Sequence, residues 1–241
     1  MGRAPLHARC AVAAALAAAC AGPVPPPGDG PVPTGDGPVV RQPPEPERAP
    51  SGGPGALILA FDDPAELARL ELTDPAMWRV DSGSLELLGK SAYEPPHRSP
   101  HSIALLDSGP VGDFVLEARL RQTGREYGHR DLCLVFGHVD PANFYYVHLA
   151  TAPDPWAHNV FLVDDADRVA LAPVPERGVD WGTDVWHDVR VERAGTRIRV
   201  WFDGALTHEV HDATHGAGRV GLGSFDDQGR FDDVVLASPD L

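Results

Sequence analysis

Apolar and polar residues alternate along residues 186–204. Every second side chain of a β-strand faces the same side, so the alternation predicts strands with one face in a core and one face in water. Gly195 separates two alternating runs and can adopt the positive φ of a tight turn. Asp203 and Gly204 indicate a second turn before residues 206–210. The stretch therefore predicts a β-meander whose core face is formed by Val189, Val191, Ile198, Val200 and Phe202.

Short apolar runs separated by turn residues continue this pattern from residue 56 to the end of the chain. Residues 63–72 are the one segment that predicts a short helix, with Asp63 as its N-cap and Pro64 at its first position. About a dozen short strands, turn signals roughly every 8–12 residues and little helix are typical of an all-β sandwich. Further strands are predicted at residues 56–61, 78–80, 84–88, 102–106, 114–121, 131–138, 143–150, 158–163, 168–171, 219–222 and 234–236.

The neighbouring predicted strands 131–138 and 143–150 separate core residues from a polar cluster. The polar face carries Asp131, Tyr146 and His148, and His158 begins the next strand. Aromatic rings can stack on the C–H face of a sugar, while carboxylate, imidazole and amide groups bind its hydroxyls. These residues therefore indicate a carbohydrate-binding face. The opposite, core-facing set is Leu132, Leu134, Phe136, Tyr145, Val147 and Leu149.

Two sets of site residues follow from this cluster. An Asp–His pair can act as a general base and its orienting group, which makes Asp131, His148 and His158 the candidate catalytic residues. The alternative interpretation is that these polar groups only satisfy one another on a sheet face exposed to solvent. The candidate ligand-binding residues are His129, Arg130, Tyr146, Trp156 and Asn159.

Other residue patterns restrict the chemistry. No glycine-rich phosphate loop, HExxH, GxSxG or cysteine-pair zinc motif occurs in the chain. Cys133 is the only cysteine beyond residue 20, and its position within a strand predicts a small buried sheet residue. Glu117 and Arg119 fall on the same face of one predicted strand and indicate a structural ion pair.

Acidic residues gather near the end of the chain. Asp226 and Asp227 precede a predicted turn, and Asp232 and Asp233 follow it. Such pairs fit hydrogen bonds to turn amides and, as the alternative, a calcium site. No metal ligand is assigned from the sequence, and calcium is the one cofactor considered. Further calcium candidates are Asp154, Asp164, Asp165 and Asp167.

The overall charge narrows the classes of partner. The chain has 241 residues, a formal net charge of −15 and 43% hydrophobic residues, which suffices for one domain with a sizeable core. A strongly acidic protein is repelled by phosphate backbones and anionic lipid surfaces. The composition therefore argues against nucleic acid as a partner.

The first 55 residues differ in composition from the rest. Residues 1–19 combine a basic start with a short uncharged apolar run, which predicts a signal peptide of the lipoprotein type and an extracytoplasmic location. The residues before Cys20 resemble a lipobox, so Cys20 is the predicted lipidation site and membrane anchor; simple secretion with cleavage near Cys20 is the alternative. Residues 20–55 are rich in Pro and Gly and predict a disordered linker before a domain at residues 56–241.

The strand pattern also resembles a known superfamily. The adjacent Trp186 and His187, the valine-alternating strand, the glycine turn and the closing Asp-Gly pair are similar to concanavalin A-like jelly-roll domains. The similarity spans residues 56–237 and is nearest to 3-keto-disaccharide hydrolase domains, with laminin G-like and family-16-glycosidase-like domains as neighbours. Further matching segments are residues 61–63, 78–80, 83–85, 143–148, 218–225 and 231–236.

This resemblance implies two stacked antiparallel sheets, one of them bent into a concave groove that binds carbohydrate. It also implies hydrolysis or elimination at a 3-keto sugar or a related glycoside, with Asp131, His148 and His158 in acid/base or metal-binding roles and Tyr146 and Trp156 positioning the sugar ring. The Glu-x-Asp-x-x-Glu strand of family-16 glycosidases is absent, so their mechanism is not expected. The alternative is a non-catalytic laminin G-like module that binds a protein or glycan partner.

Overall fold

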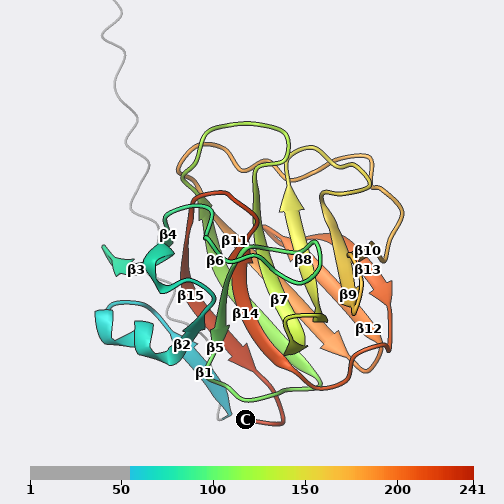
Figure 1. Cartoon of the computed structure of the whole chain (residues 1–241), viewed down its shortest axis with the longest axis horizontal. Helices are drawn as coiled ribbons and strands as arrows, with labels where there is room; N and C mark the ends of the chain where they lie inside the picture. Colours follow the sequence, from blue (N-terminus) through green and yellow to red (C-terminus); the bar gives the residue numbers. More distant parts are fainter. Residues whose placement is uncertain (1–54) are drawn as a thin grey trace, which may run out of the picture. The chain divides into compact units, whose positions relative to one another are not determined.

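The computed structural model describes residues 55–241, which form two stacked β-sheets (Figure 1). The predicted signal peptide, Cys20 and the predicted linker up to residue 54 lie outside the described residues. No helix within residues 55–241 is long and apolar enough to cross a membrane. The strands are β1 (Ala56–Leu59), β2 (Leu70–Leu72), β3 (Trp78–Asp81), β4 (Ser84–Leu87), β5 (Ser102–Leu106), β6 (Phe114–Gln122), β7 (Asp131–Asp140), β8 (Asn143–Ala150), β9 (Asn159–Asp164), β10 (Val169–Ala170), β11 (Trp186–Ala194), β12 (Arg197–Phe202), β13 (Ala205–His211), β14 (Arg219–Ser224) and β15 (Gly229–Ala237).

Every pair of neighbouring strands is antiparallel. The 8-stranded sheet has the order β13-β12-β11-β6-β15-β4-β3, and β1 pairs with β15. The 7-stranded sheet has the order β10-β9-β8-β7-β14-β5-β2. The predicted all-β sandwich of two antiparallel sheets is thereby confirmed.

The core lies between the two sheets and contains the apolar residues that the alternation selects. Both predicted core faces, the one on the meander and the one on β7 and β8, belong to a single cluster of buried residues. A fully buried Val, Leu or Phe side chain contributes roughly 1.5–3 kcal/mol to folding. This burial fixes which face of each strand turns outward, because a shift of one residue would expose the whole apolar set.

The two predicted hairpin turns are also confirmed. Gly195 has a φ of +59° between β11 and β12, and Asp203 and Gly204 have φ values of +49° and +76° between β12 and β13. The second turn has positive φ at both of its central residues, Asp203 and Gly204, which is typical of a type I′ turn. The twist of such a turn matches that of the flanking strands.

The predicted helix at residues 63–72 is wrong in length and type. Asp63 does cap the segment by accepting a hydrogen bond from the Ala65 amide, but only Pro64–Arg69 are helical, as the 3-10 helix η1. A second 3-10 helix, η2, spans Pro75–Met77. Leu70–Leu72 instead form β2, which pairs with β5. Sheet pairing at this edge outweighs the helical preference of an isolated segment.

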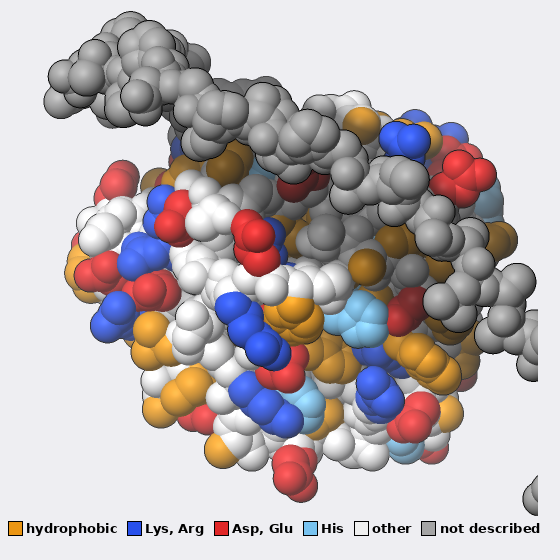
Figure 2. All heavy atoms as spheres, turned by 90° about the horizontal axis from the view of Figure 1, so that it is seen from above, with side chains coloured by type: hydrophobic (Ala, Val, Ile, Leu, Met, Phe, Trp, Pro, Cys, Tyr) orange, Lys and Arg blue, Asp and Glu red, His pale blue; other side chains and the backbone are white. Residues whose placement is uncertain are grey.

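The predicted ion pair between Glu117 and Arg119 is replaced by pairs across strands. Glu117 accepts a hydrogen bond from Arg190 of β11 at 2.8 Å, and Arg119 lies 3.6 Å from the carboxylate of Asp233. Adjacent antiparallel strands bring opposite residues closer than residues two apart on one strand. On the face seen in Figure 2, acidic and basic side chains are interspersed.

Candidate functional site

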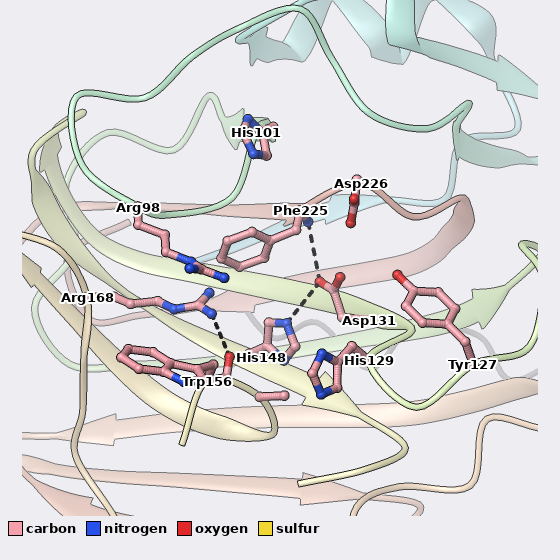
Figure 3. A pocket seen from close by; sticks show the side chains of 11 residues that line it. Arg98, His101, Tyr127, His129, Asp131, His148, Trp156, Arg168, Phe225 and Asp226 are labelled. Atoms are coloured by element: carbon pink, nitrogen blue, oxygen red, sulfur yellow. Dashed lines mark hydrogen bonds and ion pairs between the residues drawn. The ribbon is translucent and has the colours of Figure 1, made fainter. Parts of the chain in front are cut away.

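A pocket of about 400 Å³ opens on the outward face of the 7-stranded sheet (Figure 3). Its volume lies within the range of small-molecule sites. β7 and β8 form the floor, and the loops at residues 89–101, 123–130 and 151–158 supply the rim. The lining residues are Arg98, His101, Tyr127, His129, Asp131, His148, Trp156, Ala157, Arg168, Phe225 and Asp226.

The pairing of β7 with β8 determines which side chains lie next to one another on the floor of the pocket. His148 lies opposite Cys133, and Tyr146 lies opposite Val135. The outward side chains of Cys133, Val135 and Tyr146 form a second buried cluster together with Phe161 of β9 and residues of β5. Cys133 is fully buried and free, as its strand position predicted. Because both faces of β7 and β8 are buried, the floor is rigidly packed although it lies outside the main core.

Tyr127, Asp131 and Asp226 form what we name the acidic end of the pocket. The Asp131 carboxylate accepts hydrogen bonds from Cys133 Sγ at 3.0 Å and from Ser224 Oγ at 3.3 Å. Burial, and then the negative charge of Asp227, raise the pKa of Asp131 well above its usual range. Asp131 is therefore a carboxyl group that retains its proton at higher pH than an exposed aspartate.

Asp227 supports this end from behind. Its Oδ2 accepts hydrogen bonds from the Asp131 amide at 2.9 Å and from the Tyr127 hydroxyl at 2.7 Å. Three carboxylate oxygens, one from each of Asp131, Asp226 and Asp227, lie within 4.8 Å of one another. These residues could therefore hold a cation. Asp232 and Asp233 are not part of this group; Asp233 pairs with Arg119 instead.

His148 lies beside Asp131 and is held in one tautomer. Its Nδ1 accepts a hydrogen bond from the His158 amide at 3.1 Å, so the neutral ring carries its proton on Nε2. Nε2 lies 3.7 Å from Asp131 Oδ2, which is longer than a direct hydrogen bond. Burial, with the nearby Arg168 charge, lowers the pKa of His148 well below its usual value. The pair therefore consists of a neutral imidazole and a carboxyl group of raised pKa.

Arg98, Trp156 and Arg168 form what we name the basic end. The guanidinium of Arg168 lies over the rings of Phe225 at 4.3 Å and Phe161 at 4.9 Å. It donates to the Tyr146 hydroxyl at 2.9 Å and to the Trp156 carbonyl at 2.6 Å, while its buried Nε has no partner. Arg98 lies over the indole ring of Trp156 at 5.8 Å.

Four of the predicted site residues come together in this pocket. Asp131, His148, His129 and Trp156 line it, and Trp156 is 54% exposed. His129 is tied to the rim because its Nε2 lies 2.7 Å from Asp154. Tyr146 lies beneath the pocket, where its hydroxyl holds Arg168.

The other three predicted residues lie outside the pocket and make contacts within the fold. His158 has a φ of +56°, accepts a hydrogen bond from the Ala150 amide and packs against His208. Its expected place on the same face as Asp131 is corrected, because this positive φ turns the chain just before β9. Arg130 donates to the Gly182 carbonyl at 2.7 Å. Asn159 bonds the backbone of Val160 and Ala172.

Sequence reasoning missed several residues of the pocket, namely Arg98, His101, Tyr127, Arg168 and Phe225. Asp226 was predicted only to bond turn amides or, as the alternative, to bind calcium. Arg168 directly precedes the two-residue strand β10 and has no motif around it. These residues come from separate loops, so only the folded chain brings them to β7 and β8.

Comparisons with known proteins place the fold. No protein-family model matches the chain, and no curated protein matches it significantly. Among solved structures, a carbohydrate-binding module of the CBM66 type from Bacillus subtilis aligns with a TM-score of 0.55 at 17% identity, over 70% of this chain and 96% of that one.

Two further structures show the same fold. A crystal structure described as a putative glycosyl hydrolase from Parabacteroides distasonis aligns with a TM-score of 0.52 at 13% identity, over 76% of this chain and 98% of that one. The carbohydrate recognition domain of Emp46p aligns with a TM-score of 0.53 at 14% identity, over 74% and 93%. The chain thus has the β-sandwich fold of carbohydrate-binding modules and glycosyl hydrolase domains.

Proposed function

We propose that this β-sandwich binds carbohydrate in the pocket on its 7-stranded sheet. The observation that carries the proposal is a half-exposed Trp156 set among hydrogen-bonding groups of both charges in one pocket, which Phe225 also lines. An indole can cover the C–H face of a sugar, and carboxylate, imidazole and guanidinium groups can bind its hydroxyls. The fold shared with carbohydrate-binding modules supports the same function.

Loss of binding on removal of Trp156 tests this proposal. We expect Trp156→Ala to weaken the binding of glycan ligands at least tenfold by isothermal titration calorimetry, because the exposed aromatic platform is lost. A broad set of neutral and acidic oligosaccharides serves as the ligand panel. Trp201→Ala is the matched control, since Trp201 lies on the outward face of the other sheet and should leave affinity unchanged. Absence of binding to every glycan would favour the laminin G-like alternative, with a protein partner.

A second candidate function is cleavage of the bound glycoside. Asp131, a buried carboxyl group of raised pKa, shares the pocket with Asp226. Glycosidases use two carboxyl groups near the scissile bond, one of which has a raised pKa and donates the proton. His148 carries its proton on Nε2 beside Asp131, and the His158 amide occupies its Nδ1, so its role in elimination at a 3-keto sugar would be to donate a hydrogen bond to the ligand rather than to act as the base.

Product analysis tests the second function. Glycosides and 3-keto disaccharides are incubated with the protein, with Asp131→Asn and with Asp226→Asn, and products are followed by mass spectrometry. Cleavage predicts product from the unchanged protein and a loss of at least 100-fold in Asp131→Asn, because the proton donor is gone. Product at the level of a protein-free control in all samples would leave binding as the function.

We further propose export with a lipid anchor on Cys20, on the strength of the sequence of residues 1–20. Metabolic labelling with a fatty acid should label the full chain and fail to label Cys20→Ala. Equal labelling of the two chains would contradict the anchor.

A further inference from the structure

The pocket contains a buried cation that has no carboxylate partner. Arg168 is only 6% exposed, and its guanidinium contacts two rings, a hydroxyl and a carbonyl but no acidic group within residues 55–241. A buried charge is costly unless it is paired and fully hydrogen-bonded. The unpartnered Nε leaves Arg168 short of both conditions.

The other buried arginines of residues 55–241 differ from Arg168 in their partners or in their place in the fold. Arg193 is equally buried, and all three of its guanidinium nitrogens donate to backbone carbonyls. Arg130 also has unpartnered nitrogens, but it does not line the pocket. Within residues 55–241, Arg168 is therefore the buried arginine that combines an incomplete set of partners with a place in the pocket lining.

A second cation strengthens the basic end. Arg98 is exposed on the rim and has no ion pair in the described part of the chain; its guanidinium lies over the Trp156 ring. Arg168 donates to the backbone of the same Trp156. Figure 3 shows both guanidinium groups on one side of the pocket, across Phe225 and His148 from Asp131 and Tyr127.

The pocket thus has a basic end and an acidic end, and this separation of charge points to one class of ligand. We propose that, given the carbohydrate binding inferred above, the sugar carries a carboxylate that binds Arg98 and Arg168, while its hydroxyls reach the acidic end. A planar carboxylate matches the fork of guanidinium donors and supplies the charge that Arg168 lacks. A neutral sugar would displace water from Arg168 without replacing the missing anion.

A pair of ligands that share one sugar backbone and differ at the carboxyl group, as free acid and methyl ester, provides the test. Oligogalacturonates and their methyl esters share one backbone, and oligosaccharides of mannuronate, guluronate and glucuronate extend the panel with their own esters. We expect at least one free acid to bind ten or more times as tightly as its ester by titration calorimetry. Its affinity should also fall between 50 and 500 mM salt, because screening weakens the ion pair.

Variants of the two arginines locate the effect. Arg168→Gln should weaken binding of the free acid at least tenfold and change binding of the ester less than threefold. Arg98→Gln is the second variant, because its exposed position makes it safe for folding, and it should weaken the acid severalfold. Arg190→Gln, on the opposite sheet, is the matched control and should change neither.

The outcomes separate this inference from the proposed function. Equal binding of acids and esters, lost in Trp156→Ala, would keep carbohydrate binding and overturn the carboxylate. Binding of sulfated oligosaccharides without any uronate would overturn the carboxylate as well. Binding of no sugar at all would overturn both.

Discussion

The outward faces of the two sheets carry similar residue types but arrange them differently. On the 8-stranded sheet, Arg190 and Arg199 lie over Trp201 and share the carboxylate of Glu192. On the 7-stranded sheet, Arg168 also lies over aromatic rings, yet no carboxylate of the described chain pairs with it. On the first face these two arginines are paired with a carboxylate, while on the second face Arg168 lies in a pocket without one and leaves a charge for a ligand.

The difference arises from what covers each face. Strands β6, β11 and β12 alternate between buried and half-buried residues, as expected of a sheet facing solvent. Strands β7 and β8 are buried on both faces over most of their length, because loops fold over them. An ion pair in solvent contributes little, whereas an unpaired charge under a loop has a large influence on what binds there.

The largest expected effect concerns the aromatic support of Arg168. Phe161 is fully buried, stacks on Tyr146 at 5.3 Å and lies beneath Arg168. We expect Phe161→Ala to lower the free energy of unfolding by roughly 3–5 kcal/mol, because it leaves a cavity beneath the pocket. Trp201→Ala on the opposite face should cost less than about 1 kcal/mol. Urea denaturation of both variants measures the contrast, and equal losses would contradict it.

The next effect concerns the buried histidine pair beside the pocket. Burial lowers the pKa of His158 to about 4, against about 6.5 in an unfolded chain. Between these two pH values the unfolded state binds more protons than the folded state. The stabilisation that comes from burying neutral His158 is therefore complete above about pH 6.5 and is lost as the pH falls through 4. We expect a loss of about 3 kcal/mol in unfolding free energy over that range, measured by urea denaturation at several pH values.

A variant isolates the contribution of this ring. His158→Asn keeps an acceptor for the Ala150 amide and suits the positive φ, but it cannot be protonated. The variant should therefore show a flatter pH dependence than the unchanged protein. His211→Asn, on exposed β13, is the control and should retain the full dependence. The same curve for all three proteins would show that His158 does not titrate in this way.

The smallest loss of stability is expected for an ion pair on the outward face of the 8-stranded sheet. Glu117 pairs with Arg190 at 2.8 Å, and the two side chains are 41% and 38% exposed. We expect Glu117→Ala to cost less than about 1 kcal/mol, and to cost less still in about 1 M salt, because exposed pairs are screened. Thermal melting at low and high salt checks this, with glycan affinity as a second measurement that should not change. A large loss would mean that this face, too, depends on individual charges.

Much of the fold is readable from the alternation of side chains. The meander of β11 to β13, its two turns and the core faces of β7 and β8 follow from a period of two and from residues that tolerate positive φ. Residues 70–72 were assigned to the wrong element, because Leu70 continues the helical spacing from Leu67 as well as the two-residue spacing to Leu72. Only the available edge of β5 decided between them.

The candidate site, like the fold, could be predicted only in part from the sequence. Asp131 and His148 could be placed together because they lie on paired strands, where spacing along the chain fixes the face. His158 could not be placed, since its φ depends on the loop that carries it. Arg98, Arg168 and Phe225 belong to segments far apart in the chain. No local pattern reports which loops will meet over a sheet.

The amino-acid sequence by itself determined an all-β sandwich, the inward and outward faces of its strands, and the polar pair of β7 and β8. It could do so because strand geometry is local and repeats every two residues. The tertiary structure alone decided that one outward face is covered, that its cations lie apart from its carboxylates, and that Arg168 is buried without an acidic partner. Those features depend on contacts between distant loops, and burial by such contacts turns an ordinary arginine into a candidate binding group.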